Sequence, residues 1–246
     1  DPLWSRGLGD VYKRQALLGL ALLVGANAHA GVTAERTRVI FEQGKREASL
    51  ALVNQNSYPV IVQTWIDDGD LDSAPQTAQA PIMPLPPVFR LNPGQQRSLR
   101  LLHTGENLPT DRESLYWLNL YEIPPQSNEP LAEGQSRLTV TLRTQMKVIY
   151  RPHSLAKDAE EAPRQLVFRR AGNAVQVENP TAYFITLAGA EVRQGNTGSP
   201  LPAELLPPFS QRTLTPRQGL PANAGEVRYL WIDDGGNSQQ GEAELR

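Results

Sequence analysis

The sequence contains no cysteine among its 246 residues and only three histidines. The absence of cysteine excludes a disulfide framework, thiol chemistry and any cysteine-based metal site. Three histidines leave little with which to build a histidine-rich metal centre. The net charge of −2 is too close to zero to attract nucleic acid or an anionic membrane surface. These shortages favour a function that needs no bound metal or cofactor.

Known catalytic motifs are absent as well. The sequence has no G-x-S-x-G, no Walker A, no H-E-x-x-H and no dinucleotide-binding fingerprint. The run Asp68-x-Asp70-x-Asp72 superficially resembles a calcium loop, but the glycine at the sixth position and the glutamate at the twelfth are missing. His103 and His153 lie beside turn signals, so we expect them to be solvated. The sequence therefore predicts a protein that is not an enzyme.

One hydrophobic run, residues 16–24, is too short to span a membrane as a helix. It follows Lys13-Arg14 and precedes Ala28-His29-Ala30, an A-x-A cleavage pattern. Together these features predict a secretory signal peptide over residues 16–30, with the mature chain beginning directly after it. Residues 1–15 suit neither a signal nor a domain, and we interpret them as a cloning remnant. We expect the mature chain to lie in the periplasm of a Gram-negative cell, without insertion into a membrane.

Alternation of apolar and polar residues, interrupted by frequent turn signals, runs through the rest of the chain. This pattern is typical of β-sandwiches. We expect one sandwich over residues 31–152 and a second, smaller one over residues 156–246, joined by a polar segment. The stretch from Pro81 to Pro87 holds four prolines and cannot be a helix or a central strand. The strands expected in the first sandwich cover residues 33–41, 48–54, 60–66, 88–91, 96–102, 113–123 and 138–151.

The longest expected strand begins at Leu138 and is stopped by Pro152. Its first half alternates, with Leu138, Val140 and Leu142 on one side and Thr139, Thr141 and Arg143 on the other. An apolar row of this kind either packs inside its own sandwich or serves a partner supplied by another protein. The alternation alone favours the first of these interpretations.

Four motifs in the first sandwich resemble those of the periplasmic pilus (fimbrial) chaperones of the chaperone–usher pathway. Each looks like one part of that family's first domain: the opening strand, the proline segment with its following turn, the most distinctive signature, and the end of the long strand. In that order they are Glu35–Phe41, Pro84–Gly94, Asp111–Pro125 and Thr144–Pro152. The second sandwich matches more weakly, mainly at Ile232-Asp233-Asp234-Gly235.

The resemblance implies an all-β fold of two immunoglobulin-like β-sandwich domains with a cleft between them. It also implies a mechanism in which the chaperone lends its long strand to an incomplete pilus subunit and delivers that subunit to an outer-membrane usher. The row Leu138, Val140 and Leu142 would then fill the open groove of the subunit. By motif position, Arg38 and Lys147 would hold the subunit's C-terminal carboxylate. Counting by twos from Leu142 reaches Met146 rather than Lys147, so twist or a bulge would have to re-aim the strand.

A further implication of the resemblance is a buried ionic network that links the two domains. The matching positions are Glu113, Arg151 and Asp234, with Asp233 as the alternative to Asp234. The loop of about residues 126–137 looks like that of the family branch whose loop before the long strand is short.

The alternative function is that of a secreted tandem-sandwich adhesin or ligand-binding protein. Such a protein would need an aromatic platform on its loops. Trp65, Trp117 and Trp231 all lie within strand patterns instead, which favours roles in the core.

Overall fold

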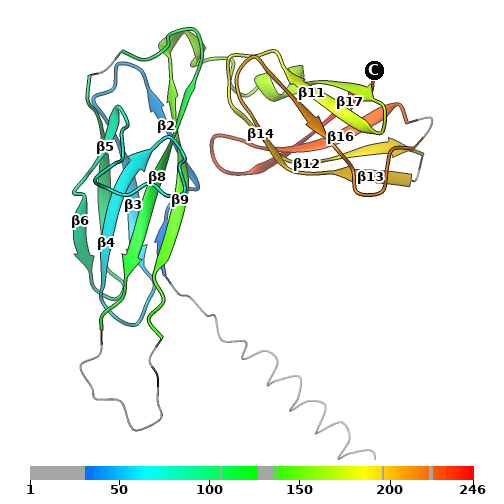
Figure 1. Ribbon diagram of the computed structural model, residues 1–246. Helices are drawn as coiled ribbons and strands as arrows, with labels where there is room; N and C mark the ends of the chain where they lie inside the picture. Colours follow the sequence, from blue (N-terminus) through cyan, green and yellow to red (C-terminus); the bar gives the residue numbers. More distant parts are fainter. Residues whose placement is uncertain (1–30, 106, 127–135, 137, 196, 222–223) are drawn as a thin grey trace, which may run out of the picture. The chain divides into compact units, whose positions relative to one another are not determined.

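The computed structural model describes residues 31–105, 107–126, 136, 138–195, 197–221 and 224–246. The expected signal peptide, the segment before it and most of the loop of residues 126–137 lie outside these described residues. The described residues belong to one unit, residues 31–246. They form two sandwiches of β-strands (Figure 1), as the alternation predicts. None of the helices in this described part is long and apolar enough to cross a membrane.

The first sandwich packs a four-stranded sheet against a five-stranded one. The four-stranded sheet has the order β1 (Val32–Ala34), β3 (Glu47–Asn54), β7 (Gln96–His103) and β5 (Ile82–Leu85). The five-stranded sheet has the order β2 (Arg38–Glu42), β9 (Leu142–Arg151), β8 (Ser114–Ile123), β4 (Val60–Asp67) and β6 (Val88–Leu91). Each strand turns alternate side chains inward, so that Leu50 and Leu52 of β3 face Leu118 and Leu120 of β8 in one core.

The opening segment differs from the expectation of one strand over residues 33–41. The chain forms two strands here, and they belong to different sheets: β1 pairs antiparallel with β3, whereas β2 pairs parallel with β9. Residues 35–37 carry the chain from one sheet to the other. The apolar pattern is the same on both sides of the crossing, so the sequence alone does not show the break. The crossing is what brings Arg38 beside the long strand.

The proline segment lies at the edge of a sheet, the position in a sheet that tolerates proline. β5 takes up Ile82–Leu85 and pairs only with β7, so it forms the edge of its sheet. An edge strand tolerates the missing N–H groups of proline, which a central strand does not. The peptide bond between Leu85 and Pro86 is cis.

The second sandwich also consists of two sheets with their own core. One sheet has the order β10 (Val167–Ala171), β11 (Ala174–Asn179) and β15 (Ser210–Leu214). The other has the order β13 (Thr197–Leu201), β12 (Ile185–Gln194), β16 (Glu226–Ile232) and β17 (Ser238–Glu244), with β14 (Glu204–Leu206) paired to β12. Phe168, Leu187, Leu206 and Tyr229 lie in the buried cluster between them. Two single-turn helices, η1 (His153–Leu155) and η2 (Ala162–Gln165), precede β10. The all-β class predicted from the sequence is confirmed.

The long strand is shorter than its sequence pattern predicts. The alternation begins at Leu138, but the ladder of β9 begins at Leu142, which pairs with Glu122 near the end of β8. β8 ends at Ile123 because Pro124 and Pro125 follow, and proline has no N–H to offer a neighbouring strand.

Candidate functional site

The apolar row of the long strand is exposed. The exposed fractions of Leu138, Val140 and Leu142 are 86%, 68% and 51%, so none of them packs inside its own sandwich. Farther along β9, on the same side, Met146, Val148 and Tyr150 are buried in the core of the first sandwich. Leu138 and Val140 precede β9, and the exposed Thr144 separates Leu142 from Met146. This side of the segment therefore has an open apolar row before Thr144 and a buried one after it.

The backbone of the same segment is open along one edge. β8 pairs with β9 over the full length from Leu142 to Tyr150. On the other edge, β2 pairs with β9 only from Lys147 to Arg151. In the described part of the chain, the edge of residues 142–146 opposite β8 thus has no ladder partner. An apolar strand with an unpaired edge is a template for another chain.

No bulge re-aims β9 between its two halves. The register with β8 runs without a shift from Ser114 opposite Tyr150 to Glu122 opposite Leu142. Lys147 therefore lies on the face of the sheet opposite to Leu142, beside Trp117. The expectation of a twist or bulge that would bring both residues to one face does not agree with this register, and the two residues serve different faces of one strand.

Arg38 and Lys147 are brought together by the parallel ladder between β2 and β9, in which they are direct partners. Arg38 is buried, with 6% of its surface exposed, and its Nη1 donates to the carbonyl oxygen of Ile232 at 3.0 Å. Its buried Nε has no hydrogen-bond acceptor among the described residues. Lys147 is half-buried, and its Nζ donates to Oγ1 of Thr186 at 2.9 Å. Neither cation forms an ion pair within the described part of the chain.

The electrostatics of this pair favour an added anion. Burial, and secondly the charge of Arg38, lower the pKa of Lys147 to about 8. Burial also lowers the pKa of Arg38, although the charges of Asp234 and Asp233 partly oppose that effect. Two desolvated cations side by side, with open donor capacity, are the arrangement that binds a carboxylate through charge-assisted hydrogen bonds. The sequence pattern alone could not have revealed the contributions of Thr186 and Ile232, because both come from the second sandwich.

Glu113, Arg151 and Asp234 meet in one ionic network. Arg151 donates from Nε to Oε1 of Glu113 at 2.6 Å, and from Nη1 and Nη2 to the two carboxylate oxygens of Asp234 at 2.6 and 2.9 Å. Oε2 of Glu113 accepts the backbone N–H of Phe184 at 2.7 Å. Asp233 instead accepts hydrogen bonds from Asn237 in its own turn and from Gln239 on β17. Of the two aspartates that the sequence left open, the contacts therefore involve Asp234.

Burial and the neighbouring charges shift the pKa values of Glu113 and Arg151 in this network. Burial raises the pKa of Glu113, and the charge of Arg151 opposes that shift. For Arg151, burial alone would lower the pKa, but the hydrogen bonds and charges of Asp234 and Glu113 outweigh it and raise the pKa. Glu113 is almost wholly buried, so its charged form depends on Arg151, whereas Asp234 is partly exposed to water.

Two aromatic side chains, Trp117 and His103, differ from expectation. Trp65 and Trp231 are buried as predicted, at 7% and 5% exposure, but Trp117 is half-buried and lies 5.6 Å from Nζ of Lys147. His103 is not a solvated ring: it stacks on Tyr150 with ring centroids 5.4 Å apart, and its buried Nε2 has no partner among the described residues. His153 is exposed. Trp117 alternates with the core residue Leu118, which is the sequence signal for its place on the outer face.

The loop after β4 shows no metal-binding geometry in the described residues. No group of three or more metal-ligating side chains gathers there or elsewhere in this part of the chain. Oδ1 of Asp70 instead accepts the backbone N–H of Asp72 at 2.9 Å, which is an ordinary turn contact.

Two β-sandwiches, an exposed apolar row before β9 and two neighbouring cations define a two-domain protein of the immunoglobulin-like class. Matches of the sequence to two family models identify the family within this class. The chain matches the pili and flagellar-assembly chaperone PapD N-terminal domain over residues 31–156 and the pili assembly chaperone PapD C-terminal domain over residues 161–243.

Individual relatives agree with these family models. The chaperone protein FimB/FhaD of Bordetella pertussis is 36% identical over 241 residues, covering 95% of this chain and 94% of that protein. The CupB2 chaperone of Pseudomonas aeruginosa has a solved structure that is 31% identical, with a TM-score of 0.72 over 87% of this chain and all of that one. The SafB chaperone in complex with the SafA pilin of Salmonella enterica is 32% identical, with a TM-score of 0.75 over 89% of this chain and 99% of that one. The chain belongs to the pilus-assembly chaperones, and it is a non-enzymatic chaperone of the chaperone–usher pathway.

Proposed function

We propose that this chaperone captures pilus subunits by lending them residues 138–146 as a β-strand and by binding their C-terminal carboxylate at Arg38 and Lys147. The observation that carries the proposal is the position of these two cations, at the point where β2 stops covering the edge of β9. A subunit strand that pairs with the open edge ends beside both cations. Strand addition of this kind draws affinity from backbone hydrogen bonds and specificity from alternate side chains.

Each part of the site has a separate physical role. Leu138, Val140 and Leu142 provide apolar area, and an aliphatic side chain that becomes fully buried contributes about 1.5–3 kcal/mol. The cost of association offsets part of this gain. The carboxylate contact fixes the register, because a shift of one residue along a strand exchanges its two faces.

Each of the two sandwiches contributes residues to the site. We propose that the chaperone domain covers residues 31–152 and the second domain residues 156–246. The network of Glu113, Arg151 and Asp234 fixes the orientation of the two domains. The second domain completes the carboxylate site through Thr186 and the carbonyl of Ile232, which hold the two cations in place.

The remaining parts of the proposal concern location and handover. We infer that the chain acts in the periplasm, on the basis of the predicted signal over residues 16–30, and that it delivers its subunits to an outer-membrane usher. The relative that is solved with a pilin supports a pilus subunit as the partner.

Co-expression tests the proposal. The chain is produced together with a pilus subunit, and the soluble fraction is separated by size. We expect a soluble one-to-one complex in the presence of the chain and subunit aggregates in its absence. An adhesin or another ligand-binding protein would give no complex and would leave the subunit aggregated.

A further inference from the structure

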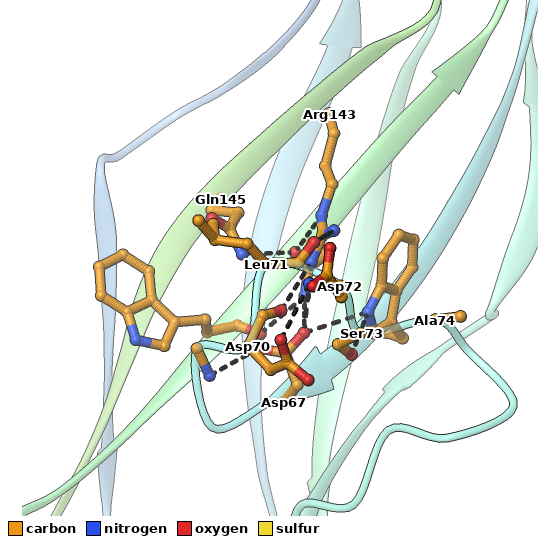
Figure 2. Close-up of polar contacts among 12 residues, drawn as sticks. Asp67, Asp70, Leu71, Asp72, Ser73, Ala74, Arg143 and Gln145 are labelled. Atoms are coloured by element: carbon orange, nitrogen blue, oxygen red, sulfur yellow. Dashed lines mark hydrogen bonds and ion pairs between the residues drawn. The ribbon is translucent and has the colours of Figure 1, made fainter.

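Arg143 follows Leu142 on β9 and points to the opposite face of the sheet. Its guanidinium donates from Nε to Oδ1 of Asn119 at 2.8 Å and from Nη1 to the carbonyl oxygen of Leu71 at 2.6 Å. Nη2 lies 3.5 Å from Oδ2 of Asp67. Figure 2 shows Arg143 reaching from the strand to the loop that holds Asp70 and Leu71. One side chain thus joins the start of the open strand to a loop that is more than sixty residues away in sequence.

Asp67 is the buried counterpart of this cation. The exposed fraction of Asp67 is 2%, and its Oδ2 accepts from Nδ2 of Asn119 at 2.7 Å and from Nε1 of Trp65 at 3.2 Å. Among the described residues, Arg143 is the only base that forms an ion pair with it. Removing the cation from a buried carboxylate strongly destabilises the folded protein. Arg143 is therefore held in place by the charge beneath it as well as by its hydrogen bonds.

The loop lies directly on the sheet. Gly69 has a φ of +102°, and a Cβ at this position would come within 2.7 Å of Nε1 of Trp117. The guanidinium of Arg143 also covers the ring of Trp65 at 4.9 Å. On the same face, Gln145 donates to Oδ1 of Asn119 at 3.0 Å. These contacts connect β4, β8, β9 and the loop near residues 142–145. We call the four side chains that make them the polar cluster: Asp67, Asn119, Arg143 and Gln145.

The polar cluster lies where β9 has the fewest ladder partners. Residues 142–146 have a ladder partner on one edge only, and the ladder ends at Leu142. A strand end with one paired edge opens first, because few contacts have to be broken. The polar cluster supplies on the outer face the support that is missing on the unpaired edge.

We propose that Arg143 is a positioning residue for subunit capture: with Asp67 and Asn119 it holds the first residues of β9 in register, so that the row ending at Leu142 is presented in one fixed orientation. The inference rests on the proposed function for what the row does. The side chain of Arg143 contributes no contact to the subunit in this account. Its effect is transmitted through the backbone of β9.

Backbone hydrogen exchange on the free chain tests the positioning step without any subunit. The variants are Arg143→Met, Arg143→Lys and, as a matched control, Arg100→Met, which removes an exposed arginine of β7 that pairs with Glu47. We expect Arg143→Met to accelerate exchange of the β8-paired amides of residues 142–146 by about tenfold or more, since it removes partners from buried groups. We expect Arg143→Lys to restore part of the protection and Arg100→Met to leave it unchanged.

A global loss of stability has to be separated from local opening. The double variant Asp67→Asn with Arg143→Met removes the buried charge together with its cation, and it should still show fast exchange confined to residues 142–146. Equal acceleration in the buried strands β3 and β7 in both variants would show an ordinary structural ion pair and would overturn the inference. Unchanged exchange at residues 142–146 would overturn it as well.

Capture of a co-expressed subunit is the second readout. We expect the double variant to yield less complex than the wild-type chain at equal chaperone level, with Arg100→Met matching the wild type. A loosened strand that captures subunit normally would contradict the inference, whereas a wild-type chain that captures nothing would contradict the proposed function. In the latter case the exchange experiment still decides whether Arg143 holds the strand.

Discussion

Arg38 and Lys147 face each other as direct partners across the parallel ladder of β2 and β9, although both carry positive charge. Like charges opposite one another on neighbouring strands destabilise a sheet. The lowered pKa of Lys147, about 8, reflects burial and the charge of Arg38. The free protein keeps this repulsion between two positive charges, and the carboxylate of an incoming subunit would neutralise it.

Replacing one of these cations should therefore separate stability from function. Lys147→Met is expected to raise the free energy of unfolding by about 0.2–1 kcal/mol, because a destabilising pair of like charges disappears. The same variant should abolish subunit capture. Thermal or denaturant unfolding at pH 7 and the yield of co-expressed complex measure the two effects. Arg38→Ala should likewise abolish capture while the chain remains folded, whereas Arg100→Ala should leave capture unchanged. Normal yields of complex from Lys147→Met would contradict the account.

Subunit capture should weaken as the pH rises through 8. Below its folded-state pKa of about 8, Lys147 is protonated and can pair with a carboxylate; above it, the free chain loses that proton. Binding at higher pH must then take up a proton, and each further pH unit costs up to about tenfold in affinity. Affinity measured between pH 6 and 10 checks this. Lys147→Arg should flatten the profile, whereas a wild-type profile without a slope above pH 8 would speak against a role for Lys147.

The same residue gives a pH dependence of stability with a defined sign. The pKa of Lys147 is lower in the folded chain than its usual value of 10.5. Between pH 8 and 10.5 the unfolded chain binds more protons at this position, so its contribution to stability rises with pH. The wild-type chain should therefore gain unfolding free energy relative to Lys147→Met over this range, first losing its deficit and then becoming the more stable of the two. A difference that stays constant would show that the lysine has an ordinary pKa.

Leu142→Glu should block capture without unfolding the free chain. Leu142 is 51% exposed, so a carboxylate at this position meets water in the free protein but would have to enter an apolar groove in the complex. Leu230→Glu is the matched control, since Leu230 is 44% exposed on β16 of the second sandwich. We expect both variants to stay folded, with a small loss of melting temperature in Leu142→Glu because its carboxylate lies opposite Glu122, and only Leu142→Glu to lose the subunit. A loss of the thermal transition in Leu142→Glu would place this residue in the core of the chain.

The ionic network should respond asymmetrically to substitution. Arg151→Met leaves Glu113 buried without its cation and is expected to cost about 3–5 kcal/mol of unfolding free energy. Asp234 has a side chain that is 44% exposed, so Asp234→Asn should cost about 0–1 kcal/mol. Denaturant unfolding of the two variants measures the difference. Equal costs would mean that the contact of Arg151 with Glu113 is no more buried than its contact with Asp234.

The sequence predicted the sandwiches because alternation and turn residues are local signals. It placed Arg38, Lys147, Glu113 and Arg151 through motif resemblance, and the structure brings these residues together in two groups. The break between β1 and β2 was missed because both halves carry the same pattern, although they belong to different sheets. The start of β9 was placed too early, because its limit is set by the prolines that end β8.

The polar cluster around Arg143 was beyond the reach of sequence reasoning. The alternation placed Arg143 on the face opposite to Leu142, and no local pattern marked Asp67 as a buried residue. Their contact depends on the loop folding back over the sheet, which no local pattern encodes. A buried aspartate at the end of β4 and an arginine of β9 become partners only in the tertiary structure.

The most direct test of the central claim is the reactivity of a single thiol on the open strand. Because the chain has no cysteine, Val140→Cys introduces a unique thiol at a position that is 68% exposed. We predict rapid alkylation in the free chain and protection in the one-to-one complex with a subunit, while Leu230→Cys stays equally reactive in both states. Alkylation of Val140→Cys at the same rate in the free chain and in the complex would contradict donation of this strand.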